Sequence, residues 1–292
     1  DHCQIVNNWI GLAPDGVSAL PNEFGIDLSG SGCAVVGNRI VGNSLVQLWI
    51  NAGNNNVVQQ NTIGYNTWAN GLPNNATGIK ISGNNNTIGG SATGSAPGLL
   101  LANYVGNMSV GGIVVDAGTG NSIRGNFVTA NGPNHDGAGM DIDLGGDGPT
   151  ANGVGNVGPD NLQHFAVIDS VLYFDYPPIG NFNMPGTITA HLDAAPGIYK
   201  VDVYYSEYCS ATTGRGHADN YLRDIAVTIP GGSTTVSFKV PVTLPTDAPW
   251  NGLSLTATSV ANGTSEMGTC FALAKGVDDA IFKSGFGTGA EY

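Results

Sequence analysis

Apolar residues recur at short, regular intervals through the first half of the chain. Phrases that join Asn and Gly to Ile or Val occupy residues 33–43, 83–90 and 120–128. Short strand-like segments stand apart from them at 25–28, 78–81 and 112–115. A repeat period in the twenties, with Asn and Gly at the corners, is typical of a β-solenoid in which each repeat forms one coil. The pattern therefore predicts stacked β-coils for this half.

Strand alternation divides these segments into inward and outward positions. The inward set is apolar: Ile26, Leu28, Leu48, Ile50, Ile79, Ile81, Ile113, Val115, Met140, Ile142 and Leu144. The outward row along the same stack reads Asp27, Trp49, Lys80, Val114 and Asp141, with neighbours ~4.8 Å apart. Corner Asn residues tolerate positive φ and bond to nearby backbone, so we expect them to stack into ladders from coil to coil.

The pattern changes after Leu144. A stretch rich in Gly, Asn, Asp and Pro covers residues 145–161, and from about residue 185 polar and apolar residues alternate with period two. Such segments, separated by turn residues, predict an antiparallel β-sandwich of roughly seven strands. We therefore expect an all-β protein: a parallel β-helix over 1–164, a β-sandwich over 165–275 and a loosely held C-terminal tail over 276–292.

Several phrases resemble the right-handed parallel β-helix repeats of bacterial secreted and surface proteins, notably 78–90 and 121–126. Residues 140–148 and 158–165 are similar to the end of the helix in the subgroup that carries a C-terminal β-sandwich. Cys209 and the phrases 214–216 and 264–266 are similar to that sandwich. The resemblance implies a right-handed helix and an extracellular or cell-surface location. Relatives with this helix include polysaccharide lyases, glycosidases and adhesins, so the resemblance leaves the activity open.

Charge and cysteine content limit the expected binding partners and the cellular compartment of the protein. A net charge of −13 disfavours nucleic acid and anionic membrane surfaces as partners, and no apolar run is long enough to span a membrane. Cys3 and Cys33 occupy similar places in neighbouring repeats, so stacking would bring them together. Cys209 and Cys270 are expected to join two strand regions of the second half. Two disulfides indicate an oxidising compartment outside the cytoplasm.

Trp49 is the first candidate for ligand binding. Flanked by Asp27 and Lys80 in the outward row, its ring is a candidate platform for a sugar, with the charged neighbours bonding to hydroxyls. The alternative is that a long loop covers the ring, as large aromatic side chains are usually buried.

An acidic cluster is the second candidate, made up of Asp136, Asp141, Asp143, Asp147 and Asp160. Alternation around Ile142 predicts that Asp141 and Asp143 both point outward, with α-carbons roughly 6.5–7 Å apart. Two carboxylates at such a spacing suit acid and base catalysis on a glycosidic bond. A competing use is a structural Ca²⁺ held by Asp143, Asp147 and Asp160, with Asn156 and Asn161 nearby. The third interpretation is that these acidic side chains lie in loops and are simply solvated. None of the three interpretations requires a cofactor other than the possible Ca²⁺.

Basic residues are scarce in the helix half, which holds Arg39, Lys80 and Arg124. Arg39 and Arg124 stand at similar places in their phrases, which predicts corner contacts. Elimination from a uronate centred on Lys80 is therefore a further alternative. The leading hypothesis is a secreted or cell-surface protein that engages extracellular polysaccharide, by binding with or without glycosidase- or lyase-like cleavage. Its rival is a non-catalytic structural or adhesive surface protein.

Overall fold

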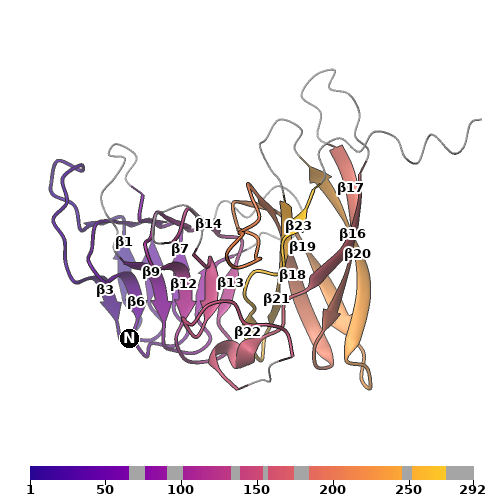
Figure 1. Cartoon of the computed structure of the whole chain (residues 1–292). Coiled ribbons are helices and arrows are strands. Elements are labelled where there is room, and N and C mark those ends of the chain that lie inside the picture. Colours follow the sequence, from indigo (N-terminus) through magenta and orange to yellow (C-terminus); the bar gives the residue numbers. More distant parts are fainter. Residues whose placement is uncertain are drawn as a thin grey trace, which may run out of the picture.

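The computed structural model describes residues 1–65, 76–90, 101–132, 139–153, 157–173, 184–244 and 252–273. Three parallel sheets run through the first half, and each coil of the chain gives one strand to each sheet (Figure 1). The first sheet is built from β1 (Gln4–Val6), β4 (Ala34–Val36), β7 (Val57–Gln59), β10 (Thr87–Gly89) and β13 (Ser122–Arg124). The second is built from β2 (Trp9–Ile10), β5 (Arg39–Ile40), β8 (Thr62–Ile63), β11 (Tyr104–Gly106) and β14 (Phe127–Thr129). The third is built from β3 (Phe24–Leu28), β6 (Val46–Ile50), β9 (Thr77–Ile81), β12 (Gly111–Val115) and β15 (Ile142–Leu144). These stacked parallel sheets fit the predicted β-helix.

The interior of the coils is filled by the apolar residues that alternation assigned to it. Every member of the predicted inward set is buried. In the third sheet Leu48 pairs with Ile79, and Ile113 pairs with Ile142, so like side chains stack from coil to coil. Full burial of one such branched side chain contributes about 1.5–3 kcal/mol, which makes this column a main source of stability.

One position of the third sheet breaks simple alternation. It holds Gly25, Gln47, Gly78, Gly112 and Asp141, each directly before the buried Ile or Leu of its strand. A Cβ on Gly78 would lie 2.6 Å from Cγ1 of Val105, and one on Gly112 would lie 2.5 Å from Cγ1 of Val128, so this position also faces inward. Gly leaves room for the facing sheet, while Gln47 and Asp141 place a polar side chain there.

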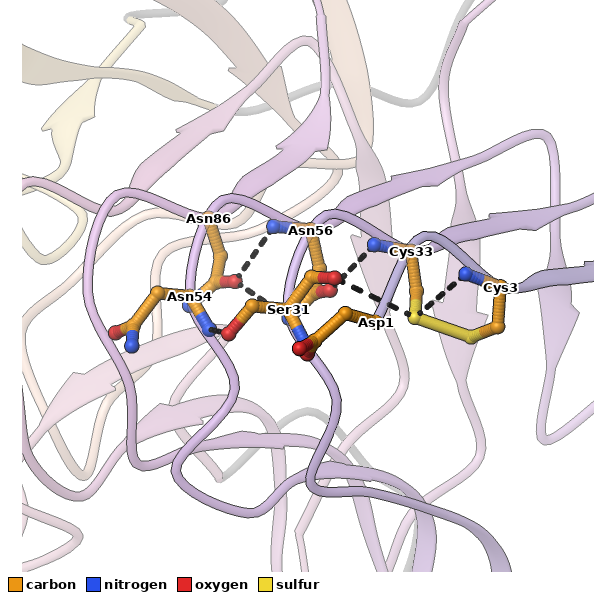
Figure 2. The surroundings of a disulfide bond; sticks show 7 residues. All are labelled: Asp1, Cys3, Ser31, Cys33, Asn54, Asn56 and Asn86. Atoms are coloured by element: carbon orange, nitrogen blue, oxygen red, sulfur yellow. Dashed lines mark hydrogen bonds between the residues drawn. A yellow bond between two sulfur atoms is a disulfide. The ribbon is translucent and has the colours of Figure 1, made fainter.

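Asn ladders run along the corners, as predicted. In one ladder the backbone N–H and the Nδ2 group of Asn56 both donate to Oδ1 of Asn86, and Asn86 donates in the same way to Asn121. Figure 2 shows the start of this ladder, where the N–H of Cys33 donates to Oδ1 of Asn56. Each rung points toward the C-terminal end of the helix, so the last Asn needs an acceptor from elsewhere.

A second ladder joins Asn8, Asn38, Asn61, Asn103 and Asn126. Successive members are 30, 23, 42 and 23 residues apart. The period in the twenties therefore describes only the shortest coils. The longer coils contain extra residues between corners that stay in register, because added chain length costs little free energy once its ends are fixed.

The Asn103→Ala substitution should destabilise the protein strongly. It removes the acceptor for the buried N–H and Nδ2 groups of Asn61, at a cost of about 2–5 kcal/mol. Asn84→Ala is the matched control, since Asn84 lies in an exposed ladder where water replaces the lost partner. Thermal unfolding followed by circular dichroism should show that Asn103→Ala lowers the free energy of unfolding by several kcal/mol. Asn84→Ala should lower it by less than ~1 kcal/mol. Equal drops would contradict this role of the buried ladder.

Two antiparallel sheets form the second half. One is built from β16 (Val167–Tyr173), β17 (Met184–Asp193) and β20 (Thr235–Leu244). The other is built from β19 (Asn220–Ile229), β18 (Gly197–Ser206), β21 (Gly252–Ser259), β22 (Gly263–Thr264) and β23 (Phe271–Ala272). Their facing sides share one apolar core, to which Ile188, Val203 and Leu255 contribute.

The sheet around β18 is a middle layer between this core and the last coil of the helix (Figure 1). Val203 faces the β16–β17–β20 sheet, whereas the next residue, Tyr204, packs in the core of the coils. The last coil would otherwise expose free strand edges, which invite pairing with other chains. Its N–H groups are instead capped by Asp160, Thr264, Tyr204, Ala218 and Glu266.

Both predicted disulfides are present. Cys3 is bonded to Cys33 in neighbouring coils, and Cys209 is bonded to Cys270 in the second half. Figure 2 shows the first pair at the head of the Asn ladder. The two bonds fit a protein that folds in an oxidising compartment.

Candidate ligand-binding site

The outward row of the third sheet runs through Asp27, Trp49, Lys80, Val114 and Asp143. Strand register pairs Asp27 with Trp49, Trp49 with Lys80, and Lys80 with Val114. Val114 then pairs with Asp143, so the predicted end of the row at Asp141 is wrong by two residues. The error follows from the inward-facing position described above, which Asp141 occupies.

Trp49 sits on this row with its ring partly exposed. Its indole N–H donates to Oγ of Ser82 at 3.2 Å, and the ring of Phe24 lies beside it at 5.3 Å between centroids. Ser82 follows β9 and Phe24 begins β3, so neighbouring coils hold the indole from two sides. The ring is therefore fixed in orientation before any ligand arrives.

Lys80 extends over the Trp49 ring, with Nζ 5.5 Å from the ring centroid. The same Nζ lies 3.4 Å from Oδ1 of Asp116, and both side chains remain partly exposed. The Asp116 carboxylate also accepts a long hydrogen bond of 3.4 Å from the Ser82 hydroxyl. We call Phe24, Asp27, Trp49, Lys80, Ser82 and Asp116 the Trp49 site. It combines two aromatic rings with two carboxylates, one ammonium and the Ser82 hydroxyl.

Asp141 does not point outward as expected. It is 2% exposed, and its Oδ2 accepts the backbone N–H of Ala218 at 2.7 Å. Its Oδ1 accepts Nδ2 of Asn131, and Nδ1 of His217 lies 3.3 Å from Oδ2 without hydrogen-bond geometry. Asp141 thus connects Asn131 of the last coil with Ala218 of the second half. The prediction of a solvent-facing acid at this position is corrected.

Asp143 lies on the outward face, as predicted, but it is covered and only 8% exposed. Its two carboxylate oxygens accept the N–H groups of Gly146 and Gly148, at 3.0 and 3.2 Å. Burial raises the pKa of Asp143, against the opposing effect of these hydrogen bonds. The carboxylate shapes the turn that follows β15. The structure therefore does not present Asp141 and Asp143 as a solvent-facing catalytic pair.

The predicted calcium ligands are not brought together. Asp147 is exposed, whereas Asp160 is completely buried and accepts both donors of Asn121 on its Oδ1. Asn161 donates to Asn262. Among the described residues, no group of three or more His, Cys, Asp or Glu side chains could hold a metal ion. Asp136 and Asn156 lie outside the described residues.

Asp160 has a structural task that the sequence did not reveal. It takes the place of the next Asn at the end of the Asn56–Asn86–Asn121 ladder, where an acceptor is required and a further donor would be unpaired. Burial raises its pKa to about 7, against the hydrogen bonds from Asn121. In the sequence, Asp160 stands where the next corner Asn of the ladder would be expected. The residues around it do not resemble the repeat phrases, so the two positions could not be aligned.

The two arginines of the helix half have different roles, contrary to the expected shared corner contact. Arg39 lies in β5 with its guanidinium 5.8 Å from the centroid of the Trp9 ring. Arg124 lies in β13 and pairs with Asp202 and Asp224 of the second half. The repeat pattern did not reveal Phe24, Ser82 and Asp116 of the Trp49 site. Ser82 and Asp116 both directly follow the β9 and β12 strands, a position that stacking brings together.

A small hollow lies at the junction of the two halves, lined by none of the residues of the Trp49 site. Leu144, Thr150, Phe165 and Glu266 are among its lining residues. It is too small for more than solvent. In the described part of the chain, no helix has the length and apolar character needed to cross a membrane.

Comparison with known proteins does not assign a family. No family model matches the chain, and no curated protein matches it. Among solved structures, the enzymatically active domain of bacteriophage CBA120 tailspike protein 4 is similar at 14% identity, with a TM-score of 0.18. The match covers 93% of this chain and 44% of that one, so this chain spans less than half of the neighbour's length. A likeness this weak carries no argument about function.

Proposed function

We propose that this is a secreted or cell-surface protein that binds polysaccharide through the Trp49 site. The observation that carries the proposal is the partly exposed Trp49 ring, fixed by Ser82 and Phe24 on an otherwise regular sheet face. Binding sites typically combine such aromatic surface with a few well-placed polar groups. Asp27 and Lys80, in register with Trp49 on the neighbouring coils, supply those groups.

The fixed ring also favours affinity. Ordering a flexible side chain on binding costs about 0.5–1.5 kcal/mol, and the hydrogen bond to Ser82 means that Trp49 has already met this cost in the free protein. The apolar face of the Trp49 ring can pack against the C–H face of a sugar, while the charged groups of Asp27 and Lys80 beside the ring bond to the sugar hydroxyls. The two disulfides support an extracellular setting for such a ligand.

The proposal is binding without cleavage. Asp141 and Asp143, the expected acid and base, are both buried and engaged by backbone N–H groups. A general acid or base must reach the proton that it transfers. The geometry of these two residues therefore favours a binding protein over a glycosidase that uses them.

The Trp49→Ala substitution should abolish most glycan binding. We expect at least a tenfold rise in Kd, equivalent to about 1.4 kcal/mol, because the apolar platform is lost. Trp49→Phe should retain part of the affinity. The measurement is a glycan array followed by titration calorimetry with the best ligand.

Trp9→Ala is the matched control, because Trp9 is 58% exposed on a different sheet of the helix. It should leave binding unchanged, and circular dichroism should show that all three variants are folded. If wild-type protein bound no glycan, or if Trp49→Ala bound as well as wild type, the proposal would fail. The rival interpretation, a structural or adhesive spacer, predicts that result.

A further inference from the structure

The charges of the Trp49 site are unequal. Two carboxylates, Asp27 and Asp116, stand against one ammonium, that of Lys80. Lys80 is already paired with Asp116 at 3.4 Å. Asp27 is exposed, and among the described residues no side chain forms an ion pair or hydrogen bond with its carboxylate. With two carboxylates and one ammonium, the site carries a net formal charge of −1, on a chain whose net charge is −13.

Acceptors also predominate among the hydrogen-bonding groups of the site, because two carboxylates stand against one Lys80 ammonium that already contacts Asp116. A carboxylate accepts hydrogen bonds and donates none. The indole N–H of Trp49 is spent on Ser82, so the ring offers its apolar face and no donor. A ligand that fits these groups must bring donors of its own. Sugar hydroxyls do so, and a hydrogen bond from a hydroxyl to an ionised acceptor is stronger than one between neutral groups.

A uronate sugar is less suited to these groups than a neutral sugar, because it carries a carboxylate of its own. Its carboxylate needs a donor or a cation, and the Lys80 ammonium is the one described cation of the Trp49 site. To bind there, the uronate would have to displace Asp116 and approach Asp27, and juxtaposed like charges oppose association. The lyase alternative centred on Lys80 requires such an approach.

We propose that the Trp49 site selects neutral, hydroxyl-rich glycans and rejects uronate polymers. This inference rests on the proposed function and specifies its ligand class. In it, Asp27 and Asp116 accept sugar hydroxyls, Trp49 packs against the apolar face of a pyranose, and Lys80 positions the Asp116 carboxylate.

The test compares three hexasaccharides by titration calorimetry at low ionic strength: cellohexaose, mannohexaose and hexagalacturonate. At least one neutral probe should bind at least tenfold more tightly than hexagalacturonate. The double substitution Asp27→Asn with Asp116→Asn should weaken neutral binding several-fold and strengthen hexagalacturonate binding, because Lys80 loses its internal partner. Lys80→Met should not strengthen hexagalacturonate binding, and Trp9→Ala should change neither.

The outcomes separate the two proposals. Tighter binding of hexagalacturonate by wild type, lost in Lys80→Met, would overturn the ligand class and leave polysaccharide binding intact. Equal binding of neutral and uronate probes would also overturn it. If no glycan binds at all, both proposals fail together. Unfolding temperatures of all variants, measured in parallel, distinguish a lost contact from a lost fold.

Discussion

Replacing Arg124 with Met should destabilise the protein by about 3–5 kcal/mol, the usual cost of removing one partner of a buried ion pair. Arg124 projects from the last coil and pairs with Asp202 and Asp224 of the second half. The Asp202 side chain is completely buried, so loss of the guanidinium leaves an uncompensated charge at the junction. The unfolding temperature should fall by on the order of 10 °C.

A double-mutant cycle separates the ion pair from simple packing. Asp202→Asn added to Arg124→Met removes the orphaned charge and should recover part of the loss, because the two effects are coupled. Arg39→Met is the matched control, since Arg39 lies on the same helix but contacts Trp9 within it. We expect a loss below ~1 kcal/mol for that variant. Additive losses in the cycle would show that Arg124 and Asp202 do not act as a pair.

The protein should be more stable at pH 5 than at pH 8. Burial raises the pKa of Asp160 and of Glu266 to about 7, and that of Asp202 and Asp219 to about 6. All four lie at the junction of the two halves or beside it. In each case the folded-state pKa lies above the ordinary value, so the folded protein binds more protons than the unfolded chain between pH ~4 and 7.

The sign of the effect follows from this proton uptake. Stability is then highest below the unfolded pKa values and falls as the pH rises through the folded ones. One pKa unit corresponds to about 1.4 kcal/mol, so the two units between pH 5 and the folded-state pKa of Asp160 make a difference on the order of 3 kcal/mol between pH 5 and pH 8. Burial opposes the charged form of His217, but the Asp141 carboxylate outweighs this and raises the His217 pKa. The stability that protonated His217 contributes is therefore also lost as the pH rises through its folded-state pKa.

Urea unfolding at pH 5, 6, 7 and 8, at constant ionic strength, measures this dependence. Asp160→Asn keeps an acceptor for Asn121 but cannot ionise. Its buried Nδ2 group adds a cost that does not depend on pH, so its stability relative to wild type should be higher at pH 8 than at pH 5. Asp147→Asn is the control, because Asp147 is exposed a short way along the chain. A flat profile, or a maximum at pH 8, would contradict the assignment of these buried carboxyls.

Hydrogen bonds between residues far apart in the sequence join the two halves. The acceptors that cap the last coil come from segments distant in sequence: Thr264 lies 141 residues beyond Ile123, and Glu266 lies 122 beyond Leu144. The helix therefore depends on the second half to satisfy its final N–H groups. We accordingly expect the helix and the middle sheet to unfold together, because separation exposes both an open strand edge and several buried charges.

The sequence by itself determined the features that depend on local period. Every residue that alternation assigned to the interior of the third sheet is buried, and repeated corner positions identified the Asn ladders and the Cys3–Cys33 pair. It also singled out Trp49 with Asp27 and Lys80, since parallel register alone places them side by side. Stacked coils repeat the same local geometry, so a pattern in one coil holds in the next.

Only the tertiary structure decided what the acidic residues do. Asp141 turns inward because a second position of each strand in the third sheet faces the interior, and Asp160 ends a ladder that the sequence shows only as scattered Asn residues. Arg124 meets Asp202 and Asp224 across 78 and 100 residues. Such contacts arise where the repeat stops and a different sheet packs on it, and no local period encodes which charged groups meet there.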